Sequence, residues 1–351
     1  MTLKTGIVKD YRYLRHQTSP YHPESPQRLE AMYEMIESPD MEGKFAEIEP
    51  RHATHEEIGL IHQPSYMERV AGTAGKAHAS LDPDTETSPE SYDVARLAVG
   101  GFCNAIDSVV KGEVNNAFAF VRPPGHHAEA NRAAGFCIFN NIAIGAMHAI
   151  NNHNMEKILI VDWDLHHGNG TQHSFYKDPR IVYFSTHQYP FYPGTGSVQE
   201  IGRGAGEGYT INVPLRRGPG DAEYLRIFKR ILEPVALEFK PDMVMLSAGF
   251  DIYYNDPLGG MKVTPAGFGR LSRVLMDIVD SCCEGKFVVT LEGGYHIAGI
   301  TESAKVMLNE MCGETHVTDE ELAKIEREAD SSIDGIIETV INQVGPFWPV
   351  F

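Results

Sequence analysis

The chain has 351 residues, of which 42% are hydrophobic, so it is long enough to bury a sizeable core. Its 48 acidic residues outnumber 30 basic ones, which gives a formal net charge of −18. Because binding to nucleic acid phosphates needs a basic face, this charge argues against a nucleic acid partner and mildly favours a cationic one.

The cysteine content and the lack of long apolar runs predict a cytoplasmic protein. The number of cysteines is odd and no C-x-x-C pair occurs, which fits a reducing compartment; they are Cys103, Cys137, Cys282, Cys283 and Cys312. Residues 1–16 hold no long apolar run, so we expect no signal peptide. No stretch approaches the roughly 20 apolar residues of a membrane helix, so we expect no membrane partner.

The N-terminal third predicts short strands, helices and one acidic loop. Residues 4–9 and 45–49 have the pattern of short strands. Pro26 can open a helix that runs to Ile36, and residues 54–70 follow a helical pattern throughout. Residues 75–91 are polar and acidic and are interpreted as an exposed loop, either inert or functional.

Helices and strands alternate over the rest of the chain. Helices are predicted over 92–111, from the segment after 137 to about 151, over 222–239 and 264–283, with two more within 299–342. Strands are predicted over 117–121, 158–161, 181–185, 209–213, 243–247 and 287–291. With the two N-terminal strands, this pattern calls for a parallel eight-stranded sheet with helices on both faces. We therefore expect an α/β fold in a single domain, residues 1–351.

The C-terminal tail, residues 345–351, is short and apolar. We expect it to pack on the body of the domain or on a second subunit. The second alternative would make the protein a homo-oligomer.

The stretch from Ile158 to Gln172 carries the strongest chemical signal. An apolar strand runs into Asp162, Asp164 and His166, and a chain that stayed extended would place these side chains on one face. Such a group is costly to bury without a cation or hydrogen-bond partners. For this motif alone, a hydrogen-bonded turn without a metal is the alternative.

Polar residues follow the ends of four predicted strands. They are His126 and His127, then Asp164 and His166, then Asp251, and finally Tyr295. Because ligands of open α/β sheets bind outside the carboxyl ends of the strands, we expect these side chains to converge on one site.

Asp164, His166 and Asp251 form a candidate metal site. Three protein ligands leave one position open for water, which is the arrangement of catalytic zinc sites. Zn²⁺ is the first choice, and this oxygen-rich set also accepts Fe²⁺ or Mn²⁺. Such an ion would polarise a carbonyl group and lower the pKa of its water.

A general base and an oxyanion donor are also available. His126 and His127 follow Pro-Pro-Gly, and one of them can act as a base beside the metal, although a lone histidine pair is more often structural. Tyr295 follows two glycines and can donate to a developing oxyanion, with core packing as the alternative. Together these parts suggest a metal-dependent amide hydrolase.

The motifs RPPGHHA, GFCIFNN, VDWDLHHGNGTQ, SAGFD, DPLGG and LEGGY resemble those of the zinc-dependent histone deacetylases. The similarity is to the class II-like branch, shared with bacterial deacetylase-like amidohydrolases and related to the acetylpolyamine amidohydrolases. It runs from about His22 to about Lys305 and implies the arginase-deacetylase fold, a single domain with an eight-stranded parallel sheet.

The resemblance implies a role for each matching residue. Its zinc ligands fall on Asp164, His166 and Asp251, and its catalytic residues on His126, His127, Tyr295, Asp162 and Asn169. His127 would be the general base, and His126 would be held by Asp162. Substrate-binding positions fall on Gly135, Phe136, Tyr192, Leu258, Gly293, Gly294 and Asp84. Arg28 would lie near an acetate-release cavity. Structural K⁺ would use Asp162, Asp164, His166, Ser185 and Thr186 at one site and Phe175, Asp178, Ile181 and Tyr209 at another.

Asn169 departs from the class I pattern, in which the partner of the second histidine is an aspartate. Asparagine can orient an imidazole but brings no charge, so it should raise the pKa of His127 less than aspartate would. Class II-like members commonly carry this asparagine, so it does not argue against activity.

The leading hypothesis is hydrolysis of acetyl or short acyl groups from lysine side chains of peptides or proteins. Deacetylation of acetylpolyamines or another small acetylated amine is the first alternative, and a binding module without catalysis is a remote one. The polyamine-specific branch places a glutamate at the position of Leu258, where leucine cannot pair with a secondary ammonium group. Leu258 therefore favours acetyl-lysine.

Overall fold

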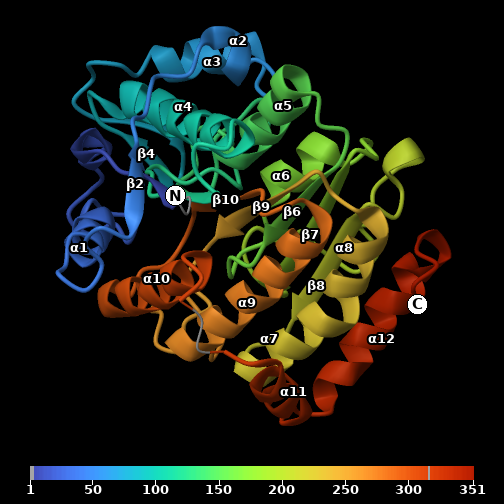
Figure 1. Ribbon diagram of the computed structural model, residues 1–351. Helices are drawn as coiled ribbons and strands as arrows, with labels where there is room; N and C mark the ends of the chain where they lie inside the picture. The colour runs from blue at the N-terminus through green and yellow to red at the C-terminus, as the bar shows by residue number, and fades with distance from the viewer. Residues whose placement is uncertain (1–3, 315–316) are drawn as a thin grey trace.

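The computed structural model describes residues 4–314 and 317–351 of the chain (Figure 1). Eight strands form one sheet in the order β2-β1-β5-β10-β9-β6-β7-β8, and every neighbouring pair is parallel. The strands are β1 (Thr5–Val8), β2 (Phe45–Ile48), β5 (Asn116–Ala119), β6 (Ile158–Asp162), β7 (Ile181–Gln188), β8 (Thr210–Leu215), β9 (Met243–Ala248) and β10 (Phe287–Leu291). The predicted parallel eight-stranded sheet is confirmed.

Helices cover both faces of this sheet, as Figure 1 shows. One face carries α4 (Ser91–Val110) and α5 (Asn141–His153), and the other carries α7 (Asp221–Ile227), α8 (Glu233–Phe239), α9 (Pro265–Cys282) and α10 (Ile297–Met311). The central strands are buried along their whole length, which explains their continuous apolar sequences. The shorter α1 (Gln27–Ile36) packs against α10, and α6 (Asn169–Phe175) follows β6.

Residues 54–70 do not form the single helix that their pattern predicts. The structure has α2 (His55–Ile58) and α3 (Pro64–Ala71), with an irregular segment between them. Pro64 has no backbone N–H and holds the preceding Gln63 in an extended conformation. The prediction was therefore wrong at a residue whose effect on helices is well understood.

The interpretation of residues 75–91 as an exposed loop was also wrong. Strands β3 (Ala79–Asp82) and β4 (Thr85–Thr87) form an antiparallel hairpin, joined at a Pro-Asp turn. Leu81, Thr85 and Thr87 are buried. The alternation of buried and more exposed side chains over three or four residues is too short to stand out within a polar segment.

The C-terminal region holds three helices where two were predicted, counting only its described residues. These are α10, α11 (Asp319–Arg327) and α12 (Ser332–Val344). Thr318 begins α11, because its hydroxyl accepts a hydrogen bond from the backbone N–H of Glu321. The predicted helix over 222–239 is present, with a π-helical turn (Phe228–Leu232) between α7 and α8.

The tail packs on the body of the domain, as one of the two alternatives predicted. Trp348 is buried, and its Nε1 donates a hydrogen bond of 2.8 Å to the carbonyl oxygen of Gly208. Its ring lies 5.5 Å from that of Tyr209 and 6.2 Å from that of Phe239. Across residues 4–314 and 317–351, the helices lack the combined length and apolarity that crossing a membrane requires.

Candidate active site

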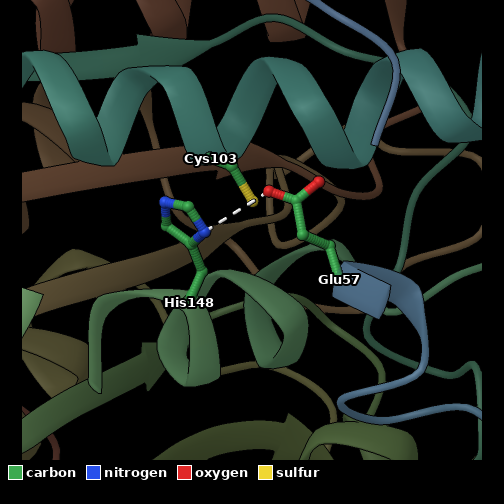
Figure 2. Close-up of side chains that lie close together, drawn as sticks. All are labelled: Glu57, Cys103 and His148. Atoms are coloured by element: carbon green, nitrogen blue, oxygen red, sulfur yellow. Dashed lines mark ion pairs between the residues drawn. The ribbon is translucent and has the colours of Figure 1, made fainter. Parts of the chain in front are cut away.

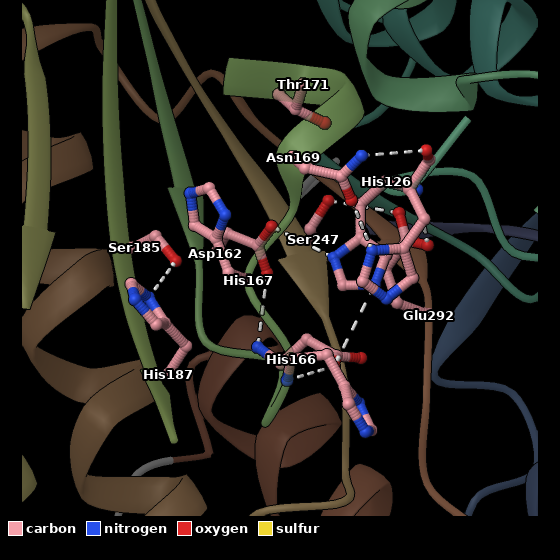
Figure 3. Close-up of polar contacts among 12 residues, drawn as sticks. His126, Asp162, His166, His167, Asn169, Thr171, Ser185, His187, Ser247 and Glu292 are labelled. Carbon is pink, nitrogen blue, oxygen red and sulfur yellow. Dashed lines mark hydrogen bonds and ion pairs between the residues drawn. The ribbon is translucent and has the colours of Figure 1, made fainter. Parts of the chain in front are cut away.

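The loops after β5, β6, β9 and β10 bring the predicted site residues together. These strands are adjacent in the sheet, and because they run parallel, their carboxyl ends share one edge. Figure 3 shows three segments meeting at this edge: His126 follows β5, Asp162 and His166 belong to the end of β6 and its loop, and Glu292 follows β10. The convergence expected from the strand ends is present in the structure.

Asp164, His166 and Asp251 form a compact group. Nδ1 of His166 lies 3.1 Å from Oδ1 of Asp164 and 3.1 Å from Oδ2 of Asp251. The second carboxylate oxygens are held by backbone donors, since Gly293 N–H bonds to Asp164 and Leu165 N–H bonds to Asp251. Both carboxylates are buried. Two buried carboxylates that each aim one oxygen at the same imidazole nitrogen fit a divalent cation.

The pKa values of this group show how strongly it needs positive charge. Burial and the adjacent charge of Asp164 raise the pKa of Asp251 to about 7. Burial lowers the pKa of His166, but the carboxylates of Asp164 and Asp251 outweigh it and raise this pKa to about 10. A bound dication would replace these protons and lower both pKa values.

The chain does not stay extended through this motif, because β6 ends at Asp162. Instead, the backbone N–H of Asp164 donates to Oδ1 of Asp162 at 3.2 Å, and that of His166 donates to Oδ1 of Asp164 at 2.8 Å. Trp163 and Leu165 are buried in the core. These local hydrogen bonds, and not the alternation of an extended strand, direct Asp164 and His166 toward the site and Trp163 and Leu165 into the core.

His126 is paired with the carboxylate of Asp162. Its Nδ1 lies 3.1 Å from Oδ2 of Asp162, which also accepts a hydrogen bond of 2.9 Å from the hydroxyl of Tyr183. Burial lowers the pKa of His126, but the charges of Asp164, Asp162 and Glu292 raise it to about 10. The predicted pairing of His126 with Asp162 is present.

The pKa of His127 is shifted in the opposite direction from that of His126. Burial lowers its pKa well below the ordinary value, and the positive charges of His126 and His166 lower it further. Its Nδ1 lies 2.8 Å from Oδ1 of Asn169. His127 is therefore a neutral imidazole oriented by an amide.

The side-chain amide of Asn169 is itself bound by the carboxylate of Glu129. Nδ2 of Asn169 donates to Oε1 of Glu129 at 2.7 Å, and the same oxygen lies 2.8 Å from Nδ1 of His173 (Figure 3 shows Asn169). Glu129 is nearly buried. The pairing of His127 with Asn169 followed from the sequence, whereas its continuation through Glu129 did not.

The site opens into a pocket of 230 Å³. Its walls include most of the predicted substrate and catalytic residues, namely Asp84, His126, His127, Gly135, Phe136, His166, Tyr192, Leu258, Gly293 and Tyr295, together with Pro124 and Phe191. The rings of Phe136 and Tyr295 lie 6.0 Å apart, edge to face. The ring of Tyr192 lies 5.1 Å from that of His127. The pocket is thus an aromatic channel that leads to the candidate metal group.

The β3–β4 hairpin holds one wall of this channel. Oδ1 of Asp84 accepts a hydrogen bond of 3.0 Å from Gly135 N–H, and Oγ1 of Thr85 accepts one of 3.2 Å from Phe136 N–H. Phe136 has a φ of +69°, a conformation that an aromatic residue adopts only under constraint. The hairpin supplies that constraint, so it has a function in shaping the channel.

Arg28 and Gly294 lie behind the pocket wall. The Arg28 guanidinium donates to the carbonyl oxygens of Gly294 at 2.6 Å and Glu292 at 2.5 Å, and it pairs with Glu24 at 3.0 Å. It also lies 5.1 Å from the centre of the Tyr295 ring. Arg28 therefore supports the loop that carries Tyr295, and an acetate-release cavity beside it stays a prediction.

The predicted potassium ligands lie around β7. Asp162 and Ser185 are partners in the β6–β7 register, and the buried hydroxyl of the next residue, Thr186, has no hydrogen-bond partner among the described residues. The second group is Phe175, Asp178, Ile181 and Tyr209. The carbonyl oxygens of Phe175, Asp178 and Tyr209 accept backbone hydrogen bonds from Asp178, Ile181 and Tyr183, near the start of β7. Occupation of either position by K⁺ remains a prediction.

Glu292 and Phe191 are functional candidates that sequence reasoning missed. Oε2 of Glu292 accepts hydrogen bonds from the N–H groups of Gly125 at 2.7 Å and His126 at 3.1 Å. The ring of Phe191 stacks 5.6 Å from that of His166. Each is the direct neighbour of a predicted site residue, since Glu292 precedes Gly293 and Phe191 precedes Tyr192. This proximity in the sequence is the signal that could have identified them.

Comparisons with known proteins agree with this geometry. Residues 22–311 match the family model described as the histone deacetylase domain. The chain is 40% identical over 347 residues to histone deacetylase HDA1 of Candida albicans, an alignment that covers 89% of this chain and 41% of that protein. It is 39% identical over 303 residues to the polyamine deacetylase HDAC10 of Homo sapiens, with 83% of this chain and 45% of that protein covered.

A solved structure extends the similarity to the whole fold. The crystal structure of the HDA15 HD domain matches with a TM-score of 0.91 at 36% sequence identity, and covers 99% of this chain and 96% of that one. The chain spans less than half the length of the two curated relatives described above.

Proposed function

The chain belongs to the histone deacetylase family and has its fold, and from this we propose that it removes acetyl groups from lysine side chains by metal-dependent hydrolysis. The observation that carries the proposal is the position of His127, His166 and Tyr295 on one pocket, with Asp164 and Asp251 bonded around His166 at its base. Acetylated lysine of a peptide or protein is the proposed substrate. The five free cysteines favour a reducing cytoplasm as the compartment.

Asp164, His166 and Asp251 would hold the metal ion, with Zn²⁺ as the first choice and Fe²⁺ as the second. When bound, the ion supplies Lewis acidity, which polarises the substrate carbonyl and makes a water molecule more acidic. The backbone N–H groups of Leu165 and Gly293 keep the free carboxylate oxygens aimed at it.

His127 is the proposed general base. It is neutral because burial and the charge of His126 lower its pKa, so its imidazole can accept a proton. Asn169 fixes Nδ1, which leaves Nε2 for the water that attacks the amide carbon. When the C–N bond breaks, the same proton can pass from Nε2 to the leaving amine.

His126 and Tyr295 are proposed to stabilise the charge that develops on the substrate. The charges of Asp164, Asp162 and Glu292 outweigh burial and raise the pKa of His126 to about 10, and Asp162, which does not bind the metal in this proposal, favours its protonated form. Burial raises the pKa of Tyr295 well above the ordinary value, so its hydroxyl stays a hydrogen-bond donor. A donor of this kind acts on the oxyanion that forms from the carbonyl group.

Acetylpolyamine is the second candidate substrate. The similarity to the human polyamine deacetylase supports it, as does the position of Asp84 at the pocket wall. Against it, Oδ1 of Asp84 is engaged with Gly135, and Leu258 offers no carboxylate to a secondary ammonium group. The aromatic rings of Phe136 and Tyr192 suit the apolar stem of an acyl-lysine side chain.

Turnover of a fluorogenic acetyl-lysine peptide, measured together with metal content, tests this proposal. We expect wild type with one bound metal ion to be active, and Asp251→Ala to lose both the ion and turnover while it keeps its circular dichroism spectrum. Tyr254→Phe, an exposed tyrosine near Asp251, serves as the matched control and should stay active. Full turnover of a metal-free preparation would refute the metal assignment.

A further inference from the structure

A second cluster of histidine and carboxylate side chains lies between α4 and α5. Nε2 of His148 and Nε2 of His153 each lie 2.7 Å from Oδ1 of Asp107, so one carboxylate oxygen faces two imidazoles. Asp107 is in the last turn of α4, and His153 is the last residue of α5. The active-site loop contacts the other end of α5, at Asn141, roughly 18 Å away along a helix of this length.

Two groups of possible ligands in this region share His148, and each could hold an ion. The group that contains the buried Cys103, called the inner group below, is unsuitable. Figure 2 shows it as Glu57, Cys103 and His148. The carboxylate of Glu57 is already bound by the guanidinium of Arg51 at 2.7 and 2.5 Å, and it also accepts from Thr54 N–H at 2.8 Å. Burial raises the pKa of the Cys103 thiol, which keeps it protonated and a poor ligand.

The outer group has the right donors for a metal. We propose that Asp107, His148 and His153 form a second binding site for a divalent transition metal ion that takes nitrogen and oxygen ligands, such as Co²⁺, Ni²⁺ or Fe²⁺. Two imidazoles and one carboxylate with open positions are a recognised ligand set for such ions. Water molecules would complete the coordination.

The spacing of the donor atoms favours octahedral over tetrahedral coordination. Ligand atoms about 2.1 Å from an ion are about 3.0 Å apart at right angles and about 3.4 Å apart at the tetrahedral angle. The observed nitrogen–oxygen separations of 2.7 Å are the lengths of hydrogen bonds. At these two nitrogen–oxygen edges, replacing the protons by an octahedral ion therefore needs a lengthening of only a few tenths of an ångström.

A metal on Nε2 of His148 would change the hydrogen bond at the other ring nitrogen. Its Nδ1 would then carry the proton and need an acceptor. Nδ2 of Asn152 lies 2.8 Å from Nδ1 and donates to it, so a metal on Nε2 requires this amide to rotate and present its oxygen to Nδ1. Oε1 of Glu57 lies 3.5 Å from the same nitrogen. An acceptor on the far nitrogen is the usual support of a metal-bound histidine.

An ion can also reach the site from solvent. The side chains of His153 and Asp107 are 15% and 23% exposed, and Asp107 lines a surface hollow of 370 Å³. The ammonium group of Lys111 lies 3.9 Å from the other oxygen of Asp107, and its side chain is more than half exposed. It can therefore move into solvent when a cation binds. The ion would tie the end of α4 to the end of α5.

Titration of Co²⁺ into protein whose catalytic position is loaded with zinc tests the proposal. Calorimetry and the visible absorption of Co²⁺ should report one equivalent bound with micromolar affinity in wild type. The double variant Asp107→Asn/His153→Asn should lose this equivalent and keep its turnover of the acetyl-lysine peptide. Cobalt that exchanges into the catalytic position would appear equally in both proteins.

Two control variants separate the alternatives. Cys103→Ala removes a member of the inner group only, and His78→Asn removes an exposed histidine elsewhere; both should keep the equivalent. If the double variant does not fold, His153→Gln alone should weaken binding at least tenfold. Wild type should also gain thermal stability from Co²⁺, whereas the variants without the site should not. Absence of the extra equivalent in wild type, its survival in the double variant, or its loss in Cys103→Ala would each overturn the assignment.

Discussion

Asn169 donates a hydrogen bond of 2.7 Å from its side-chain Nδ2 to Oε1 of Glu129. Because a carboxylate accepts and cannot donate, this bond fixes the amide with its nitrogen toward Glu129 and its oxygen toward His127. That oxygen accepts from Nδ1 of His127, so the proton of the neutral imidazole is on Nδ1. Glu129 thus sets the tautomer of the proposed base through another residue, and it supplies the charge that asparagine lacks.

We predict that Glu129→Gln lowers kcat roughly 10-fold with KM nearly unchanged, since a glutamine amide no longer dictates the orientation of Asn169. Loss of the negative charge should also lower the pKa of His127 and move the acidic limb of the kcat/KM profile to lower pH. The measurement is the dependence of kcat/KM on pH for wild type, Glu129→Gln and the control variant His173→Asn, which keeps the carboxylate of Glu129. A profile that does not move would show that Glu129 only supports the fold.

The same geometry predicts a ranking among neighbouring variants. His127→Ala removes proton transfer itself, which contributes about 10²–10⁴ to the rate, so it should cost the most. Asn169→Ala should cost less, and Glu129→Gln the least. Steady-state kinetics on one acetyl-lysine peptide give this order directly, and an Asn169 variant slower than the His127 variant would contradict the assigned roles.

For Tyr295→Phe we predict unchanged substrate affinity and a loss of turnover of roughly 10²–10³, the usual effect of removing one oxyanion donor. The ring remains to pack against Phe136 and under the Arg28 guanidinium, so the fold should keep its thermal midpoint. Binding of an uncleaved peptide analogue and kcat are measured side by side. Unaltered turnover would mean that the tyrosine only packs.

Leu258→Glu should shift substrate choice toward polyamines. Wild type is expected to have a higher kcat/KM for acetyl-lysine peptides than for acetylspermidine, and the glutamate should move this ratio at least about 10-fold, or 1.4 kcal/mol. The carboxylate would lie at the pocket wall, where it can pair with a secondary ammonium group. Leu258→Gln is the uncharged control. A wild type that already prefers acetylspermidine would remove Leu258 from the specificity argument.

Acid should destabilise the protein through Glu24. This buried carboxylate pairs with Arg28 at 3.0 Å and with Arg122, and these charges outweigh burial and lower its pKa to about 2. Because the folded pKa lies below the ordinary value of 4.5, the stabilisation is present above pH 4.5 and is lost as pH falls toward 2.

The matching measurement is the free energy of unfolding between pH 3 and 7 for two variants. Glu24→Gln should lose roughly 3–5 kcal/mol at pH 7, since two buried guanidinium groups lose their partner, and its curve should be flatter in acid. Glu30→Gln, on the exposed side of α1, should follow wild type. Parallel curves for wild type and Glu24→Gln would contradict the assignment.

The fold and the candidate metal group were predictable because their signals are local. Each central strand is a short apolar run, and Asp164, His166 and Asp251 follow two such runs within a few residues. Parallel strands bring their carboxyl ends to one edge, so the sequence positions already implied the meeting of these side chains. The family motifs then supplied the individual roles.

The residues that were missed depend on contacts between distant segments. Glu292 is held by Gly125, His126 and Ser247, which lie up to 167 residues away, and no spacing in the sequence links them. The β3–β4 hairpin was missed because its strands are short and polar, and its importance comes from two hydrogen bonds to Gly135 and Phe136. Pro64 is different, since its effect on the helix could have been read from the sequence.

The hydrogen bond between Arg28 and Gly294 joins residues that are 266 positions apart in the chain. Contacts between such distant residues form slowly, because a long loop must close before they contribute. The loop of Tyr295 can therefore take its final position only after helix α1 has docked against α10. During synthesis, α1 emerges long before β10 and the loop that follows it, so α1 must wait for its partner. We expect catalytic competence to be acquired only when β10 has joined the middle of the sheet and α1 has docked.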